Sequence, residues 1–468
     1  MMMRSAAALL AVCLIGCQNP ETDKPHHKPV HIDTDTAAEP VDFAAQALEE
    51  FTAYVEQNLD ETGVPGASLA VLYEGQIYTA TLGVRLLGSE QYIEEDTLFM
   101  YGSTTKTIMV AAILALIDEG AFSLDTKLSE LIPGTVTDGT FDQDIDLNDL
   151  LTHSAGLPPF FEMGCGPAAE PLANWLGRME PLDVWVEPGT LFSYSNSGYA
   201  LVARAAEIAT GDGFETVVAE RALGPAGMAN SSYIIPGNER AIGHLGPPWA
   251  PTQTDGIDCV SVRAAGGIWG TATDMARFAQ SVMDGTLPGI DRYLGDPIPT
   301  GRGADVDYGF GMFEEPYRGL QITSHGGSVN GYGAALTMVP ERDFAVVTLL
   351  NGFTVAGDPF EIGKAAIDIF LQPTGDRPVY TADPQLWEGW SGEYTAMDGG
   401  ILEAYVSGGE MQVYVPATDV EVTMPYDAGE TFRVSDDGIL RVTFWLDDAG
   451  QPQWMSTPWG IGAFTGGN

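Results

Sequence analysis

A serine and a lysine stand three residues apart at the start of an apolar stretch. Ser103 and Lys106 lie in Tyr-Gly-Ser-Thr-Thr-Lys, directly before the apolar run 107–116. The run predicts a helix with Ser103 at its N-terminus and Lys106 on the same face. Because burial lowers the pKa of a lysine, its neutral amine could take the serine proton. The pair predicts a nucleophile and its base, with a serine N-cap beside a surface lysine as the alternative.

Two later motifs could complete such a site. Tyr194 and Asn196 follow a turn in Phe-Ser-Tyr-Ser-Asn-Ser. A phenol beside a lysine can relay a proton, and a carboxamide can bind a substrate amide. His325, Gly326 and Gly327 stand just before a predicted hairpin, where two glycines let a substrate backbone approach an edge strand closely. A polar surface loop and a glycine-rich turn are the alternatives for these two motifs.

The elements that must position these residues are a sheet and its helices. Helical spacing of apolar residues predicts a helix from Asp42–Phe43, and alternating segments predict β-hairpins over 67–84 and 333–351. A helix is expected over 361–371. We expect both hairpins in one antiparallel sheet, the terminal helices on one face, and a mostly helical region inserted between the halves. From about Pro373, short strands separated by turn signals predict a small antiparallel β meander or barrel.

The three motifs, taken in order, resemble one known superfamily. Ser103-x-x-Lys106, Tyr194-x-Asn196 and the His-Gly-Gly stretch are similar to the serine β-lactamase and penicillin-binding-protein superfamily. The resemblance is to its branch of class C β-lactamases, D-Ala-D-Ala carboxypeptidases and esterases. Three further stretches are similar to that branch: 150–158, 265–275 and 308–312. The resemblance covers about 43–372 and implies an α+β, β-lactamase-like fold, with 373–468 as an accessory β domain.

The resemblance also implies roles for the motif residues. Ser103 would be the acylated nucleophile, and Lys106 and Tyr194 would share the acid and base work. Asn196 and the His325-Gly326-Gly327 stretch would contact substrate, and backbone N–H groups of Ser103 and Ser328 would form the oxyanion hole. The loop that holds His153 is structural in this family. No metal or organic cofactor is implied.

One departure bears on the substrate. Many β-lactamases carry Lys-Thr-Gly where this chain has His325-Gly326-Gly327. Histidine supplies a cation for a substrate carboxylate only when it is protonated. We therefore expect an esterase or peptidase that cleaves a small ester or amide bond, with a cell-wall-derived peptide among the candidate substrates. The alternatives are a β-lactamase or D,D-carboxypeptidase proper, and a non-catalytic penicillin-sensing or binding module.

Composition and the N-terminus indicate where the protein acts. The 468-residue chain has a net charge of −45, which excludes nucleic acid as a partner. Residues 1–16 are typical of a signal peptide, and Leu-Ile-Gly-Cys17 resembles a bacterial lipobox. We expect a lipidated Cys17, a tether over 17–42, and an exported lipoprotein whose only membrane contact is its anchor. Gln18 favours the outer membrane, facing the periplasm or the cell surface.

Two cysteines remain after the leader and the lipobox. Cys165 and Cys259 form an even pair in an oxidising compartment, which predicts a disulfide. Two buried free thiols are the alternative.

Overall fold

The computed structural model describes most of the chain from Asp42 onward. It covers residues 42–466 with gaps at 135–136, 138–143, 158–165, 168, 179–181, 183, 185, 246–251, 257, 291–306, 353–357, 377–386, 397–399, 417–419, 425, 429–430, 434–440, 447–451 and 458–459. The predicted signal peptide, Cys17, nearly all of the tether and Cys165 lie outside the described residues.

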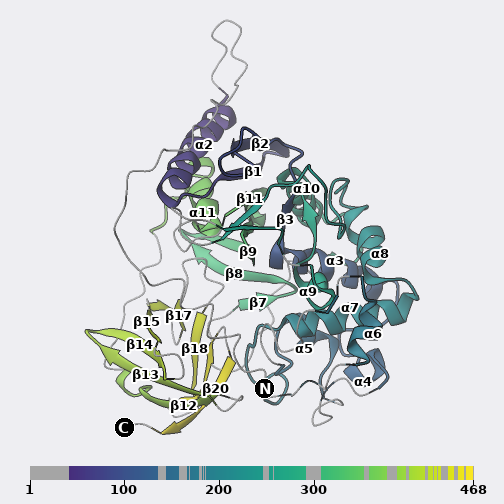
Figure 1. Ribbon diagram of the computed structural model, residues 1–468, viewed down its shortest axis with the longest axis vertical. Helices are drawn as coiled ribbons and strands as arrows, with labels where there is room; N and C mark the ends of the chain where they lie inside the picture. The colour runs from purple at the N-terminus through teal and green to yellow at the C-terminus, as the bar shows by residue number, and fades with distance from the viewer. Residues whose placement is uncertain are drawn as a thin grey trace, which may run out of the picture.

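A seven-stranded antiparallel sheet forms the centre of the larger part of the molecule (Figure 1). Its order is β2-β1-β11-β10-β9-β8-β7, so the two predicted hairpins lie side by side in one sheet. Ala67 on β1 pairs with Leu350 on β11 across the join. The strands are β1 (Gly66–Tyr73), β2 (Gln76–Gly83), β7 (Asp307–Gly309), β8 (Met312–Tyr317), β9 (Leu320–Val329), β10 (Tyr332–Val339) and β11 (Phe344–Leu350).

Helices cover both faces of this sheet. The terminal helices α2 (Phe43–Thr62) and α11 (Pro359–Phe370) pack on one face, as predicted. Each helix is preceded by an aspartate whose carboxylate accepts a backbone N–H from two residues further on. Asp42 accepts from Ala44, and Asp358 accepts from Phe360. Helix α10 (Ala272–Met283) packs against β11 and β1 and belongs to the hydrophobic core of the opposite face.

The inserted region is mostly helical and surrounds one buried helix. Residues 105–116 of α3 (Thr105–Asp118) are all buried, because this helix is apolar on every side. The surrounding helices are α4 (Leu128–Leu131), α5 (Leu147–Leu151), α6 (Leu172–Leu176), α7 (Asn196–Thr210), α8 (Phe214–Val218) and α9 (Val260–Gly266). Two small sheets pair β3 (Phe99–Met100) with β6 (Trp269–Gly270) and β4 (Gly243–Leu245) with β5 (Thr252–Thr254). Within the described residues, no helix is long and apolar enough to cross a membrane.

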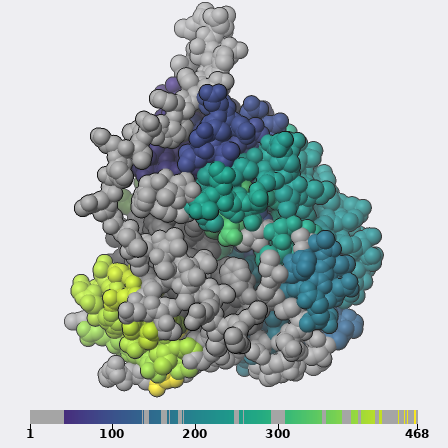
Figure 2. Space-filling view, viewed as in Figure 1, coloured from purple at the N-terminus to yellow at the C-terminus, as the bar shows by residue number. Residues whose placement is uncertain are grey.

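The C-terminal part is a nine-stranded antiparallel sheet, in which the last strand pairs with the first. Figure 2 shows it in yellow-green, apart from the teal helical region. Trp387, Trp390 and Phe444 belong to its own buried cluster. The strands are β12 (Gly392–Ala396), β13 (Ile401–Ser407), β14 (Glu410–Val415), β15 (Val420–Met424), β16 (Tyr426–Ala428), β17 (Thr431–Arg433), β18 (Arg441–Leu446), β19 (Pro452–Thr457) and β20 (Gly460–Gly466).

Cys259 is disulfide-bonded at the start of α9. Its backbone forms an antiparallel bridge with Pro167, and the Val260 N–H donates to the Gly166 carbonyl at 3.3 Å. The predicted partner, Cys165, directly precedes this segment in sequence.

Candidate active site

Ser103 lies on a single tight turn that leads into the buried helix. The turn is the 3₁₀ segment Gly102–Thr104, directly before α3. Gly102 has a φ of 55°, a left-handed conformation that glycine adopts without the steric cost of a Cβ. The Thr104 hydroxyl donates to the Tyr101 carbonyl at 2.8 Å and stabilises the turn. Ser103 itself is half-buried, which leaves it partly accessible to a small substrate.

Lys106 is fully buried in the first turn of α3 and reaches the serine. Its Nζ lies 3.2 Å from Ser103 Oγ. The same nitrogen donates to Asn196 Oδ1 at 2.7 Å and to the Ala265 carbonyl at 3.0 Å. A neutral amine has two hydrogens and one lone pair. The two acceptors take the hydrogens, so the lone pair faces the serine hydroxyl.

Burial is what keeps this amine in its neutral form, which can accept a proton. It lowers the pKa of Lys106 well below the ordinary lysine value, because desolvation disfavours the ammonium. The alternative of a surface lysine is therefore wrong. The arrangement is that of a general base aimed at a hydroxyl.

Tyr194 and Asn196 enter the site from the start of α7. Ser195 caps this helix by accepting the Gly198 N–H at 3.2 Å, and Asn196 is its first residue. The Tyr194 ring centroid lies 4.7 Å from Lys106 Nζ. Burial raises the pKa of Tyr194, an effect that its contact with the Ser103 hydroxyl opposes. The phenol therefore keeps its proton near neutral pH and can donate or relay one.

His325 is buried behind these residues on β9. Its Nδ1 lies 2.6 Å from the Gly326 carbonyl, and its ring centroid is 6.1 Å from that of Tyr194 and 5.5 Å from that of Phe313. Burial is the main cause that lowers the pKa of His325 to about 3. The imidazole is therefore neutral near pH 7 and offers no cation to a substrate carboxylate.

The glycines of β9 allow the strand to lie directly against the serine turn. A Cβ built on Gly327 would overlap the Tyr101 carbonyl oxygen and stand 3.1 Å from Ser103 N. A Cβ built on Gly102 would stand 3.0 Å from Ser328 N. The backbone nitrogens of Ser103 and Ser328 thus lie on the two facing segments, as an oxyanion hole requires.

Two further parts of the site, the Ala265 carbonyl and His153, have no chemical role among the sequence predictions. The Ala265 carbonyl holds Lys106, and a backbone acceptor has no residue type by which to recognise it. His153 is buried with a φ of 60°, accepts the Ser195 N–H at Nδ1 (3.0 Å), and lies 4.2 Å from the Tyr194 ring. Its place in the motif 150–158 was the available clue. Among the described residues, no cluster of His, Cys, Asp and Glu could hold a metal ion.

Comparison with known proteins gives one family and one fold. The family model described as Beta-lactamase matches residues 51–369. Similar curated proteins include penicillin-binding protein 4 of Amycolatopsis lactamdurans (26% identical, 69% of this chain, 92% of that protein) and unguisins hydrolase ungD' of Aspergillus campestris (26%, 68% and 63%). D-aminopeptidase of Cereibacter sphaeroides is 25% identical over 72% of this chain and 65% of its own. The chain thus spans less than two thirds of the last two proteins.

Solved structures share the fold. That of SurE matches with a TM-score of 0.68 at 22% identity and covers 90% of this chain and 100% of its own. A class C beta-lactamase matches with a TM-score of 0.61 at 20% identity, over 71% of this chain and 98% of its own. The predicted β-lactamase-like α+β fold is therefore confirmed.

Proposed function

The chain belongs to the beta-lactamase family, and on that premise we propose that it hydrolyses a small amide or ester through an acyl-enzyme on Ser103. One observation carries the proposal. The buried Lys106 amine lies 3.2 Å from Ser103 Oγ while two acceptors bind its hydrogens.

The proposed reaction uses the side chains of Ser103, Lys106 and Tyr194 and two backbone N–H groups. Lys106 Nζ takes the Ser103 proton as Oγ bonds to the substrate carbonyl carbon, and the carbonyl oxygen becomes an oxyanion between the N–H groups of Ser103 and Ser328. The protonated Tyr194 phenol, recharged by the Lys106 ammonium, passes a proton to the leaving amine or alcohol as the bond to carbon breaks. A water molecule then repeats the sequence on the acyl-enzyme, with the same amine as base.

The neutral His325 supports peptide or ester substrates over β-lactams. A β-lactam carries a carboxylate, and a buried imidazole whose pKa lies at about 3 gives it no counter-charge at neutral pH. The relative named D-aminopeptidase acts, by its name, on peptides with D-residues, and the relative named unguisins hydrolase acts on unguisins. We infer esters, amides and short peptides whose scissile bond has no carboxylate beside it, including those with D-residues, as the substrate class to test first.

Intact-mass spectrometry with a fluorophosphonate and, separately, with a penicillin tests this function, beside Ser103→Ala. We expect a fluorophosphonate adduct that Ser103→Ala loses, turnover of a p-nitrophenyl ester and of D-amino-acid amides, and slow or no turnover of a chromogenic cephalosporin. A persistent penicillin adduct without ester turnover would favour the sensing module. No adduct with either reagent would refute the acyl-enzyme.

We propose further that the protein is an exported lipoprotein anchored through Cys17. The support is the leader 1–16 and the Leu-Ile-Gly-Cys sequence that ends at Cys17. In a bacterial host, Cys17→Ser should move the protein from the membrane fraction to the soluble fraction. Retention in the membrane would contradict the anchor.

A further inference from the structure

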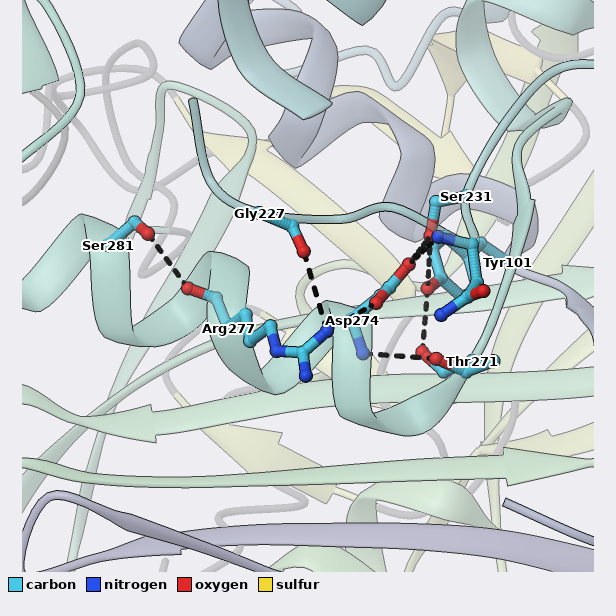
Figure 3. Close-up of polar contacts among 8 residues, drawn as sticks. Tyr101, Gly227, Ser231, Thr271, Asp274, Arg277 and Ser281 are labelled. Atoms are coloured by element: carbon cyan, nitrogen blue, oxygen red, sulfur yellow. Dashed lines mark hydrogen bonds and ion pairs between the residues drawn. The ribbon is translucent and has the colours of Figure 1, made fainter. Parts of the chain in front are cut away.

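A buried carboxylate next to the active-site segment has no part in the chemistry proposed above. Asp274, near the N-terminus of α10, is fully buried. Its Oδ2 accepts the Asn230 N–H at 2.7 Å and the Ser231 hydroxyl at 2.9 Å, and Arg277 donates to Oδ1 at 3.2 Å (Figure 3). A buried carboxylate with this many donors holds its neighbours rigidly, because losing any donor would leave charge unsatisfied.

The contacts continue from Ser231 to Tyr101, as Figure 3 shows. The Tyr101 phenol donates to the Thr271 carbonyl at 2.7 Å and lies 3.2 Å from Ser231 Oγ. Tyr101 is fully buried, and that burial raises the pKa of its phenol, so the group remains a hydrogen-bond donor. The Tyr101 hydroxyl thus has two hydrogen-bond partners, Ser231 and Thr271, and Tyr101 lies two residues before Ser103.

The backbone of Tyr101 touches both halves of the oxyanion hole. Its N–H donates to the Ile268 carbonyl at 2.9 Å, and its carbonyl accepts from Thr104 in the serine turn at 2.8 Å. The same carbonyl oxygen lies against Gly327, where no Cβ would fit. Tyr101 therefore sets the distance between the turn that carries Ser103 and the strand that carries Ser328.

From these contacts we infer that Tyr101, held by Ser231 and Asp274, is a positioning residue for the oxyanion hole. The inference rests on the proposed function. The phenol never meets substrate. It holds the two N–H donors at the spacing that the oxyanion needs, so its loss weakens binding of the transition state and leaves ground-state binding unchanged.

The test compares Tyr101→Phe and Ser231→Ala with the full-length wild type and with Tyr317→Phe. Like Tyr101→Phe, the control removes the hydroxyl of one buried tyrosine. The Tyr317 hydroxyl donates to the Asp368 carboxylate, and Tyr317 lies in the core of the opposite sheet face. Loss of one oxyanion donor costs on the order of 10²–10³ in rate, and a displaced donor should cost about tenfold or more. For both test variants we expect kcat for a p-nitrophenyl ester to fall about tenfold or more, and KM to stay within about twofold of the wild-type value.

Three readouts separate positioning from mere stability. An alkylboronic acid, which mimics the tetrahedral state, should bind more weakly by the same factor as kcat falls. The pH dependence of kcat/KM should keep its midpoints, because Lys106 is untouched. Tyr317→Phe should retain kcat at a comparable loss of melting temperature.

Wild-type kcat and boronate affinity in Tyr101→Phe and Ser231→Ala would overturn the inference, as would an equal loss of kcat in Tyr317→Phe. The proposed function fails differently, since then the fluorophosphonate would not label Ser103 in the wild-type protein at all.

Discussion

At the scale of single residues, the site depends on one lysine buried in the core. Within the described residues, its hydrogen-bond partners include no carboxylate. Lys106 has only neutral partners within hydrogen-bonding distance: a hydroxyl, a carboxamide and a backbone carbonyl. A carboxylate there would stabilise the ammonium and remove the base. Its absence from these contacts leaves desolvation as the cause of the lowered pKa.

Replacing this lysine tests the base directly. Lys106→Met keeps an apolar stem of similar length, so we expect the fold to persist and kcat to fall by the roughly 10²–10⁴ of general-base catalysis, or more. The matched control is Lys127→Met, which removes a partly exposed lysine paired with Asp146 at 3.1 Å. Ester hydrolysis and thermal unfolding of both variants check this. Near-wild-type kcat in Lys106→Met would contradict the mechanism.

The pH dependence of activity separates the lysine from the histidine. Activity requires the free amine, so kcat/KM should fall as the pH drops through the lowered pKa of Lys106. Burial holds the pKa of His325 at about 3, so His325 stays neutral from pH 5 to 8. His325→Gln should therefore leave the pH midpoints unchanged. A midpoint near the ordinary histidine value that disappears in this variant would show that His325 titrates in function.

At the scale of elements, strand β9 and the serine turn approach each other only because Gly327 lacks a side chain. A Cβ there would overlap the Tyr101 carbonyl and crowd Ser103 N. The strand must then shift away from the turn, and the oxyanion donors separate.

Gly327→Ala should thus lower kcat by on the order of 10²-fold or more, as loss of an oxyanion donor does. Gly213→Ala is the control, since the nearest atom to its Cβ is a Glu215 carboxylate oxygen at 3.5 Å. Steady-state kinetics of both variants is the measurement, and equal activities would refute the close approach.

Helix α5 begins with two aspartates that cap each other. Asp146 accepts the Asp149 N–H, and Asp149 accepts the Asp146 N–H, both at 3.1 Å. Asp149 also accepts the Ser154 hydroxyl at 2.9 Å, next to His153 of the site. Burial, reinforced by the Asp146 charge, raises the pKa of Asp149 to about 6.

This shift predicts a slope of stability with pH. The folded state holds the Asp149 proton more tightly than the unfolded state, whose pKa is near 3.8. The resulting stability is present below about pH 4 and is lost as the pH rises towards 6. Asp149→Asn should remove that part of the slope, whereas the exposed Asp125→Asn should retain it. Denaturant titrations between pH 4 and 7 measure it, and an unchanged slope in Asp149→Asn would contradict the shift.

At the scale of the whole molecule, a disulfide at Cys259 lies at the start of α9, the helix whose Ala265 carbonyl holds Lys106. If its partner is Cys165, as predicted, the bond closes a loop of 94 residues, which would stabilise the fold by about 4–5 kcal/mol in the chain-entropy model. Cys259→Ser and Cys165→Ser should lower the melting temperature equally, and the double variant no further. Non-reducing peptide mapping should recover the two cysteines together. Additive losses, or a different partner, would contradict the pairing.

The sequence alone determined the main fold and which groups we predict to do the chemistry. Alternating segments predicted two hairpins of one sheet, and β1 and β11 do pair. Strand alternation and helical periodicity are local properties, so they can be read from neighbouring residues. Ser103, Lys106, Tyr194 and Asn196 were predicted because three motifs, each with a plain structural alternative of its own, follow one another in the order of one known superfamily.

The tertiary structure alone decided what surrounds those groups. That His325 is buried and neutral, that Ala265 supplies an acceptor, and that Asp274 connects through Ser231 to Tyr101 all depend on contacts between segments far apart in the chain. Burial and hydrogen-bond partners set a pKa and a donor's position, and both arise only when those segments pack together. A local pattern therefore predicts which residues react, and only the packed fold determines their charge and their spacing.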